Sequence, residues 1–180
     1  MAGKLEKVYA DALFELAVED NTLDTVAEEM EAVAGIMNEN SDFLKLLSAP
    51  TVSDKDKKSM LSKAFEGRIS DNVFNFINVL CDNGRIKYLI AISQQFKDMY
   101  NDKNGILEVI VTTTMPLSDN LREKLVLKLE KISSKKIQLV EKIDTSIMGG
   151  IVLNYNNTQI DASVKKRLDT MRQQIDSIIA

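Results

Sequence analysis

Two aspartates and a pair of glycines are the residues of this 180-residue chain whose types could support chemistry. Asp144 and Asp161 could act as paired carboxylates, and Gly149-Gly150 could suggest a phosphate-binding loop. The Gly-x-x-x-x-Gly-Lys-Ser/Thr pattern of such a loop is missing, so close backbone packing at a strand bend is the better interpretation. One aspartate is expected to be a helix cap and the other a turn residue. We therefore expect structural roles for all four.

Nucleophilic and metal chemistry lack the residues on which they usually depend. The chain contains no histidine, which is the commonest general base and metal ligand. Its single cysteine, Cys81, lies in an apolar helical stretch and is interpreted as a small buried hydrophobe. A lone cysteine forms no internal disulfide, which fits a reduced cytoplasmic setting. The sequence predicts a protein that is not an enzyme and holds no cofactor and no metal.

Charge is distributed unevenly along the chain, whose formal net charge is −4. Residues 1–104 carry 12 Lys and Arg against 18 Asp and Glu, whereas residues 105–180 carry 11 against 9. The two parts are therefore expected to meet different partners. The basic clusters Lys135-Lys136 and Lys165-Lys166-Arg167 are interpreted as solvated surface, so no nucleic-acid partner is expected. No apolar run of about 18 residues is present, and we expect no direct insertion into a membrane.

A polar cluster that ends in glycine, residues 101–105, marks the expected junction between two domains. Apolar residues before it recur at helical spacing, and those after it alternate as in strands. We predict a mainly α protein in which a six-helix bundle of residues 1–104 precedes a small α+β domain of residues 105–180. The six helices are expected over residues 3–19, from 21 or 22 to 37, around 43–47 and before Pro50, from 53 to 65, from 70 to 82, and from 84 to about 100. Ser53, with Asp56 three residues on, is expected to cap the fourth helix, and Ser70 is expected to cap the fifth.

The second domain is expected to contain a short sheet and two helices. Strands are predicted at residues 106–114, 137–143 and 151–155, followed by a turn at residues 156–158. One helix is predicted to open at residues 116–118, with Leu117, Leu121, Leu125, Leu129 and Ile132 on one face. The last helix is predicted to be capped by Asp161 or Ser163, with one apolar stripe of Val164, Leu168, Met171, Ile175 and Ile178.

The first and fifth predicted helices carry more apolar surface than one core-facing stripe requires. The first has two apolar faces, so one can enter the core while the other needs a partner. The fifth is apolar nearly all round, and both a fully buried core helix and a wall of a partner groove remain open. The faces of the first helix are Leu5, Val8, Tyr9, Ala12 and Leu16 on one side, and Ala10, Phe14, Ala17 and Val18 on the other.

Three segments of the chain together resemble one protein family. They are residues 143–153 with the following residues 160–164 and Leu168, residues 9–17 (Tyr-Ala-Asp-Ala-Leu-Phe-Glu-Leu-Ala), and the turn Asn83-Gly84-Arg85. Their order of residues resembles that of the δ subunit of F-type ATP synthases, whose mitochondrial relative is the oligomycin-sensitivity-conferring protein. The resemblance covers nearly the whole chain.

The resemblance implies a non-catalytic stator subunit that links the catalytic head to the peripheral stalk. Helices one and five would form a groove for the amino-terminal helix of an α subunit, and the second domain would hold the b subunits. Matching position assigns Tyr9, Ala12 and Val79 to the groove. Helical-wheel geometry adds Leu13, Phe74 and Ile77, and the apolar stripe of the last helix, from Val164 to Ile178, is the expected region of b-subunit contact.

The same resemblance implies a monomer present once per complex, peripheral at the cytoplasmic face of a bacterial cell membrane. Its mechanism would be mechanical, because a stator resists torque while the rotor turns. An unrelated helical adaptor or regulatory protein-binding module is the alternative, and an enzyme ranks third.

Overall fold

The computed structural model describes the backbone of residues 2–155 and 158–179, and the side chains of residues 4–155 and 158–172. The chain divides into two compact units, Met1–Tyr100 and Asn101–Ala180. Each unit contains its own cluster of buried apolar residues. Over the described residues the structure is mainly helical with a small four-stranded sheet, which confirms the mainly α class and the short sheet expected from the sequence.

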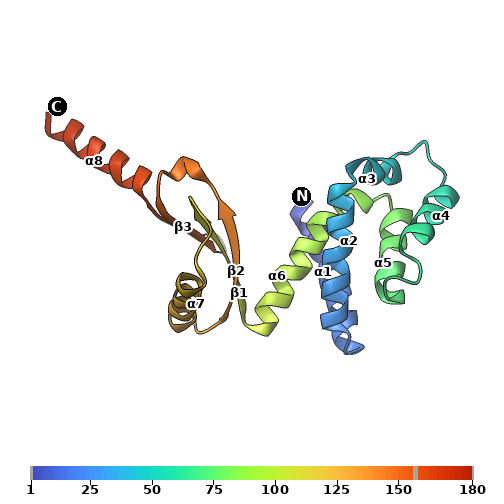
Figure 1. The fold of residues 1–180 in the computed structure, drawn as a ribbon. Coiled ribbons are helices and arrows are strands. Elements are labelled where there is room, and N and C mark those ends of the chain that lie inside the picture. The colour runs from blue at the N-terminus through green and yellow to red at the C-terminus, as the bar shows by residue number, and fades with distance from the viewer. Residues whose placement is uncertain (1, 156–157, 180) are drawn as a thin grey trace. The chain divides into compact units, whose positions relative to one another are not determined.

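The first unit is all helical in its described part (Figure 1). Buried side chains from each helix meet in one core cluster, including Met30 of the second helix and Phe96 of the sixth. Phe96 also contacts Phe14 edge to face, with ring centroids 5.6 Å apart. The elements are α1 (Ala2–Glu19), α2 (Leu23–Glu39), α3 (Ser41–Ser48), α4 (Asp54–Phe65), α5 (Asp71–Asp82), the 3-10 turn η1 (Ile86–Tyr88) and α6 (Leu89–Asn104).

Two predicted helix caps have different outcomes. The Ser53 hydroxyl oxygen accepts a hydrogen bond from the Asp56 backbone N–H at 3.2 Å, so the cap predicted for α4 is confirmed. Ser70 precedes α5 as predicted, but its side chain makes no capping bond. Instead, its N–H and hydroxyl donate to the Glu29 carboxylate at 2.9 and 2.5 Å. This serine therefore ties the start of α5 to α2, a long-range contact that sequence spacing does not reveal.

The end of α6 lies beyond its predicted position. The helix continues past Tyr100 to Asn104, and Gly105 follows with φ +62° in the left-handed region that glycine favours. The division into units falls at Tyr100, a few residues before the junction predicted from composition.

The second unit is a four-stranded sheet with two helices (Figure 1). One helix follows the first strand, and the other follows the last strand. The strand order is β2-β1-β3-β4, with β1 and β2 parallel and the other two pairs antiparallel. A helix connects the parallel pair, as such crossovers require. The elements are β1 (Ile106–Thr113), α7 (Asp119–Ser133), β2 (Lys136–Ile143), the 3-10 turn η2 (Thr145–Ile147), β3 (Gly150–Tyr155), β4 (Thr158–Ser163) and α8 (Val164–Ile179).

The core of the second unit lies between the sheet and α7. Leu107, Val109 and Val111 of β1 are buried, so the alternation predicted for this strand is confirmed. Leu125 and Leu129 of α7 pack against them. Not every residue of the apolar face predicted for α7 reaches this core, because Leu121 and Ile132 are exposed.

Strand β4 was missed by the sequence analysis, which placed only a turn and a helix cap there. The strand pairs with β3 from Thr158 opposite Tyr155 to Ser163 opposite Gly150. It lies at the edge of the sheet and is almost wholly exposed, so it needs no alternation of apolar residues. The predicted turn at residues 156–158 falls mostly outside the described residues. The Ser163 cap on α8 is confirmed, because its hydroxyl oxygen accepts the Lys166 N–H at 3.1 Å.

Candidate partner-binding surfaces

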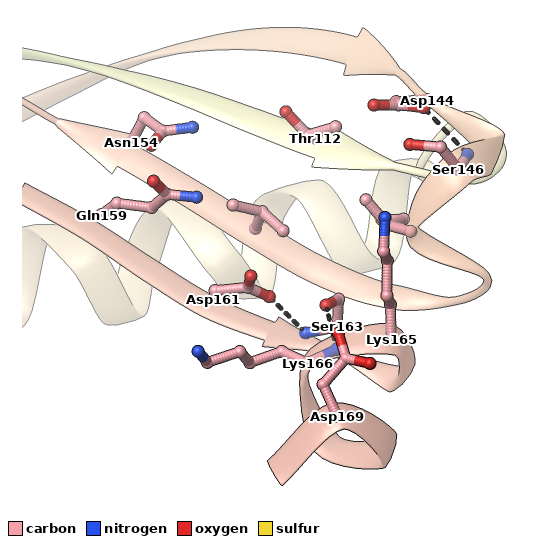
Figure 2. A pocket seen from close by; sticks show the side chains of 12 residues that line it. Thr112, Asp144, Ser146, Asn154, Gln159, Asp161, Ser163, Lys165, Lys166 and Asp169 are labelled. Atoms are coloured by element: carbon pink, nitrogen blue, oxygen red, sulfur yellow. Dashed lines mark hydrogen bonds between the residues drawn. The ribbon is translucent and has the colours of Figure 1, made fainter. Parts of the chain in front are cut away.

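The two aspartates that could have formed a catalytic pair each bond to the backbone of their own segment. They line a polar cavity of about 320 Å³, with Asp144 directly before the 3-10 turn η2 and Asp161 in strand β4 (Figure 2). The Ser146 N–H donates to Asp144 at 2.8 Å, and the Ser163 N–H donates to Asp161 at 2.9 Å. Hydrogen bonds from the side chain and from the backbone of Ser146 lower the pKa of Asp144, and those from Ser163 lower the pKa of Asp161. In both cases the side-chain bond has the larger effect. Acid–base pairs instead need pKa values that are pushed apart. Asp161 is thus a strand residue that holds the end of β4, and the capping role belongs to Ser163.

Gly149-Gly150 serves close packing rather than phosphate binding. Gly150 has φ +82°, and a Cβ added there would lie 2.4 Å from the carbonyl oxygen of Ala162. The predicted close approach of backbone at this bend is therefore confirmed.

Cys81 is buried, and burial raises the pKa of its thiol, as expected of a small core hydrophobe. Among the residues that the structure describes, no three acidic or cysteine side chains gather where they could hold a metal. The helices described here also include none with the length and apolarity needed to cross a membrane.

Helix α1 resolves into a core face and an exposed apolar face. Ala10 and Leu13 are buried in the core cluster. On the opposite side, Val8 is 60% exposed, and Ala12 and Leu16 are also exposed. Positions 8, 12 and 16 follow each other at four-residue steps, so they form a continuous stripe. The second apolar face predicted for this helix is therefore left uncovered in the first unit.

Helices α1 and α5 are joined beside this stripe by an aromatic contact. The rings of Tyr9 and Phe76 meet edge to face, with centroids 6.2 Å apart. Arg85 donates a hydrogen bond from Nη1 to the Tyr9 hydroxyl at 2.5 Å, and its guanidinium lies 5.4 Å from the centre of the same ring. A second link between the two helices is a hydrogen bond from the Asn72 side-chain amide, near the start of α5, to the carboxylate of Asp20, directly after α1, 2.8 Å long. These contacts fix the spacing of the two helices.

We define the α1/α5 surface as Val8, Ala12 and Leu16 of α1 with Val79 of α5. Val79 is 47% exposed and lies one turn beyond Phe76, which contacts α1. Tyr9 is half-buried at the base of this surface. Of the residues that the resemblance assigns to a groove, Ala12 and Val79 are thus exposed and Tyr9 is half-buried, and their contact with a partner stays a prediction.

The groove residues added from the helical wheel occupy other places. Leu13 is 2% exposed and Ile77 is 0% exposed, so both are core residues and are corrected as groove residues. Phe74 is partly buried and packs against the same core. A helix that is apolar nearly all round gives no wheel signal for which side enters the core. The wheel therefore also missed the roles of Phe76 and Arg85 in holding α1.

Helix α8 carries an exposed apolar stripe at its described end. Val164, Leu168 and Met171 are about half exposed, as the predicted stripe requires. The start of the helix is held by the Ser163 cap and by a hydrogen bond from the Val164 N–H to the Gly149 carbonyl, 3.0 Å long. The side chains of Ile175 and Ile178, which complete the predicted stripe, lie outside the described residues.

Comparisons with known proteins place the whole chain among subunits of one complex. The family model described as ATP synthase delta (OSCP) subunit matches residues 5–175. The ATP synthase subunit delta of Clostridioides difficile (strain 630) is 35% identical over 181 residues, covering 100% of both chains. The corresponding subunit of Alkaliphilus metalliredigens (strain QYMF) is 34% identical over 179 residues, covering 99% of both.

A solved structure has the same fold over nearly the same length. A chain in the cryo-EM structure of the Toxoplasma gondii mitochondrial ATP synthase hexamer aligns with a TM-score of 0.77 at 23% identity. The alignment covers 95% of this chain and 97% of that one. At this identity the likeness concerns the fold alone.

Proposed function

The chain belongs to the ATP synthase delta (OSCP) subunit family, a family of non-catalytic stator subunits, and we propose that it joins an α subunit of the catalytic head to the b subunits of the peripheral stalk. The observation that carries this proposal is the pair of uncovered apolar surfaces, one in each compact unit. The α1/α5 surface belongs to the first unit, and the α8 stripe belongs to the second. An adaptor needs two such surfaces, because each must hold a different partner.

The first surface suits an amphipathic helix. In the proposal, α1–α6 act as one six-helix bundle over residues 1–104 whose α1/α5 surface takes the amino-terminal helix of an α subunit. The apolar faces of such helices dock through residues at i, i+3, i+4 and i+7. Val8 is 60% exposed and Val79 is 47% exposed, and complete burial of one such side chain contributes roughly 1 kcal/mol of binding free energy. The contacts of Tyr9 with Phe76 and Arg85 pre-organise the surface, which lowers the entropy lost on binding.

The second surface is proposed to hold the b subunits. Residues 105–180 form an α+β domain whose last helix presents Val164, Leu168 and Met171 to solvent. A helix that leaves a regular apolar stripe uncovered is suited to pack against another helix. Ile175 and Ile178 continue the same spacing in the sequence, so we include them in the proposed b-subunit contact.

The proposed mechanism is mechanical. Rotation of the central rotor exerts torque on the head, and a stator that resists it must stay bound for many turnovers. Slow dissociation is a property of large, well-packed interfaces, for which about 1,600 Å² of total buried area is standard. No reacting group is required.

We further propose that one copy of the chain works per complex, at the cytoplasmic face of a bacterial cell membrane. The relatives named above that match over the whole chain are bacterial. No described helix could cross the bilayer, so in this proposal the partners hold the chain at the membrane.

Calorimetry with a synthetic peptide that copies the amino-terminal helix of the cognate α subunit tests this function. The parent chain should bind it, and a Val8→Asp, Ala12→Asp variant with unchanged circular dichroism should lose binding, because both positions are exposed. Ile36→Asp, an exposed apolar position on α2, is the matched control and should bind like the parent. A folded parent that fails to bind the peptide would contradict the proposal.

A further inference from the structure

The dipeptide Asn-Gly occurs twice in this chain, as Asn83-Gly84 and as Asn104-Gly105. Asparagine followed by glycine is open to a spontaneous reaction, because glycine has no Cβ to keep its backbone nitrogen away from the asparagine side chain. Both asparagines are exposed, and a Cβ added to either glycine would find nothing within 4 Å. Space therefore permits the reaction at both positions, and the hydrogen bonds around each position decide whether it occurs.

Asn83-Gly84 is locked at the end of α5. The Asn83 side-chain amide donates to the Val79 carbonyl at 2.8 Å, which holds the group that would have to leave. The Gly84 N–H, which contains the attacking nitrogen, donates to the Cys81 carbonyl at 2.9 Å. Directly after this turn, Ile86 is buried in the core of the first unit. Reaction at this position must break both hydrogen bonds and disturb the core.

Asn104-Gly105 is held less firmly at the end of α6. The Asn104 side chain makes no hydrogen bond with the residues that the structure describes. The Gly105 N–H donates to the Asp102 carbonyl at 3.3 Å, which is longer than most such bonds. Asn104 is also the last residue of its helix, and helix ends fray. The attacking nitrogen and the leaving amide are thus both available here.

We propose that Asn104 is a site of spontaneous deamidation, whereas the fold protects Asn83. The Gly105 nitrogen attacks Asn104 Cγ, the bond from Cγ to Nδ2 breaks, and ammonia leaves with the proton that Gly105 loses. The cyclic imide then adds water and opens at either of its carbonyls, which gives aspartate or isoaspartate. Water is the co-reactant, and nothing is oxidised or reduced. This modification goes beyond the proposed function, because it requires neither partner.

The products alter the backbone between the end of α6 and β1, inside the second unit. Both place a carboxylate at the carboxyl end of α6, where the helix dipole disfavours negative charge. Isoaspartate also adds a methylene to the main chain. The Gly105 carbonyl accepts the Lys136 N–H at 2.9 Å, and Ile106 pairs with Lys136 where β1 and β2 begin. A longer main chain displaces this carbonyl, so isoaspartate should weaken the start of the parallel ladder.

Peptide mass spectrometry of the full chain, aged at mildly alkaline pH and then digested with pepsin in acid, measures conversion at both dipeptides. Acid suppresses further conversion during digestion, because it keeps the attacking nitrogen protonated. In the native chain Asn104 should convert more than about tenfold faster than Asn83, a ratio that corresponds to about 1.4 kcal/mol. In urea neither position keeps its hydrogen bonds, so the two rates should agree within about threefold.

Two variants separate the chemistry from its consequence. Asn104→Gln has a longer side chain that does not form the small imide ring, so conversion at this position should be lost. Asn104→Asp carries the added charge on a normal main chain. Hydrogen exchange at Lys136 should be faster in the aged parent than in the fresh parent, and unchanged in aged Asn104→Gln and in Asn104→Asp. A carboxyl methyltransferase that returns isoaspartate to aspartate should restore protection in the aged parent.

Several results would overturn the inference. Equal conversion of Asn83 and Asn104 in the native chain would do so, as would a native chain in which neither converts while both convert in urea. Faster exchange at Lys136 in aged Asn104→Gln, or unchanged exchange in a converted parent, would refute the link to the sheet. None of these outcomes affects the α-subunit peptide test of the proposed function, since that test uses fresh protein and reads the first unit.

Discussion

Gly150→Ala is predicted to destabilise the second unit while leaving the first intact. The added methyl group would lie 2.4 Å from the Ala162 carbonyl oxygen and 3.0 Å from Ser163 Cα, and both are backbone atoms of the paired strand β4. The strand must therefore move. In addition, the φ of +82° is one that alanine rarely adopts.

The size of the effect follows from these two costs. A residue with a side chain in a positive-φ conformation costs about 1–2 kcal/mol. Overpacking against atoms that cannot turn aside costs a further 1–3 kcal/mol, roughly. A total near 3 kcal/mol would lower the melting temperature of a unit this size by about 12–24 °C. The comparison variant is Gly149→Ala, which shares the strain of a positive φ, here +144°, but whose Cβ would lie 3.3 Å from a side-chain methyl of Val164 and not against backbone.

Hydrogen exchange followed by mass spectrometry reads the two units separately. In Gly150→Ala, peptides from β1, β3 and β4 should exchange faster, while peptides from α1 to α5 should keep the protection of the parent. Gly149→Ala should have the smaller effect. If Gly150→Ala exchanges like the parent, the close approach of β3 and β4 is wrong.

Three further predictions concern the core, the thiol and Asp161. Leu13→Ala should lower the free energy of unfolding in urea by about 2–5 kcal/mol because the side chain is buried, whereas Val8→Ala should change it by less than about 0.5 kcal/mol; equal costs would contradict the two faces of α1. Cys81 should react with a disulfide reagent at pH 8 more than about tenfold slower in the native chain than in urea, and equal rates would contradict its burial. The pKa of Asp161 is lowered on folding, so its charge stabilises the fold above the unfolded value of about 3.8 and this contribution is lost as pH falls through the folded pKa. Stability measured from pH 6 to 2 should therefore fall more steeply in the parent than in Asp161→Asn, which keeps an oxygen for the Ser163 N–H; parallel profiles would count against this.

The parts of the fold that sequence predicts well are those governed by local chemistry. Ser53 and Ser163 cap helices because each lies three residues before the N–H that it accepts, a spacing visible in the sequence. The buried alternation in β1 is equally local. By contrast, Ser70 bonds to Glu29, forty-one residues away, and no local pattern distinguishes it from an ordinary cap.

The candidate surfaces were only partly predictable for a related reason. Ala10 and Leu13 enter the core while Val8 and Ala12 stay exposed, although both pairs are apolar. The choice depends on which neighbouring helices α1 meets, and a helical wheel carries no such information. Arg85 reaches Tyr9 across seventy-six residues, so its role appears only in the folded chain. Strand β4 was not predicted from the sequence, because this exposed edge strand has no alternation of apolar and polar residues.

The central claim is that one chain bridges the catalytic head and the stalk. Sedimentation of purified head with the soluble part of the b subunits, with and without this chain, tests the claim most directly. We predict that head and b subunits sediment together only when the chain is present, and separately when it carries Val8→Asp and Ala12→Asp. Equal association of head and b subunits without the chain would contradict the account.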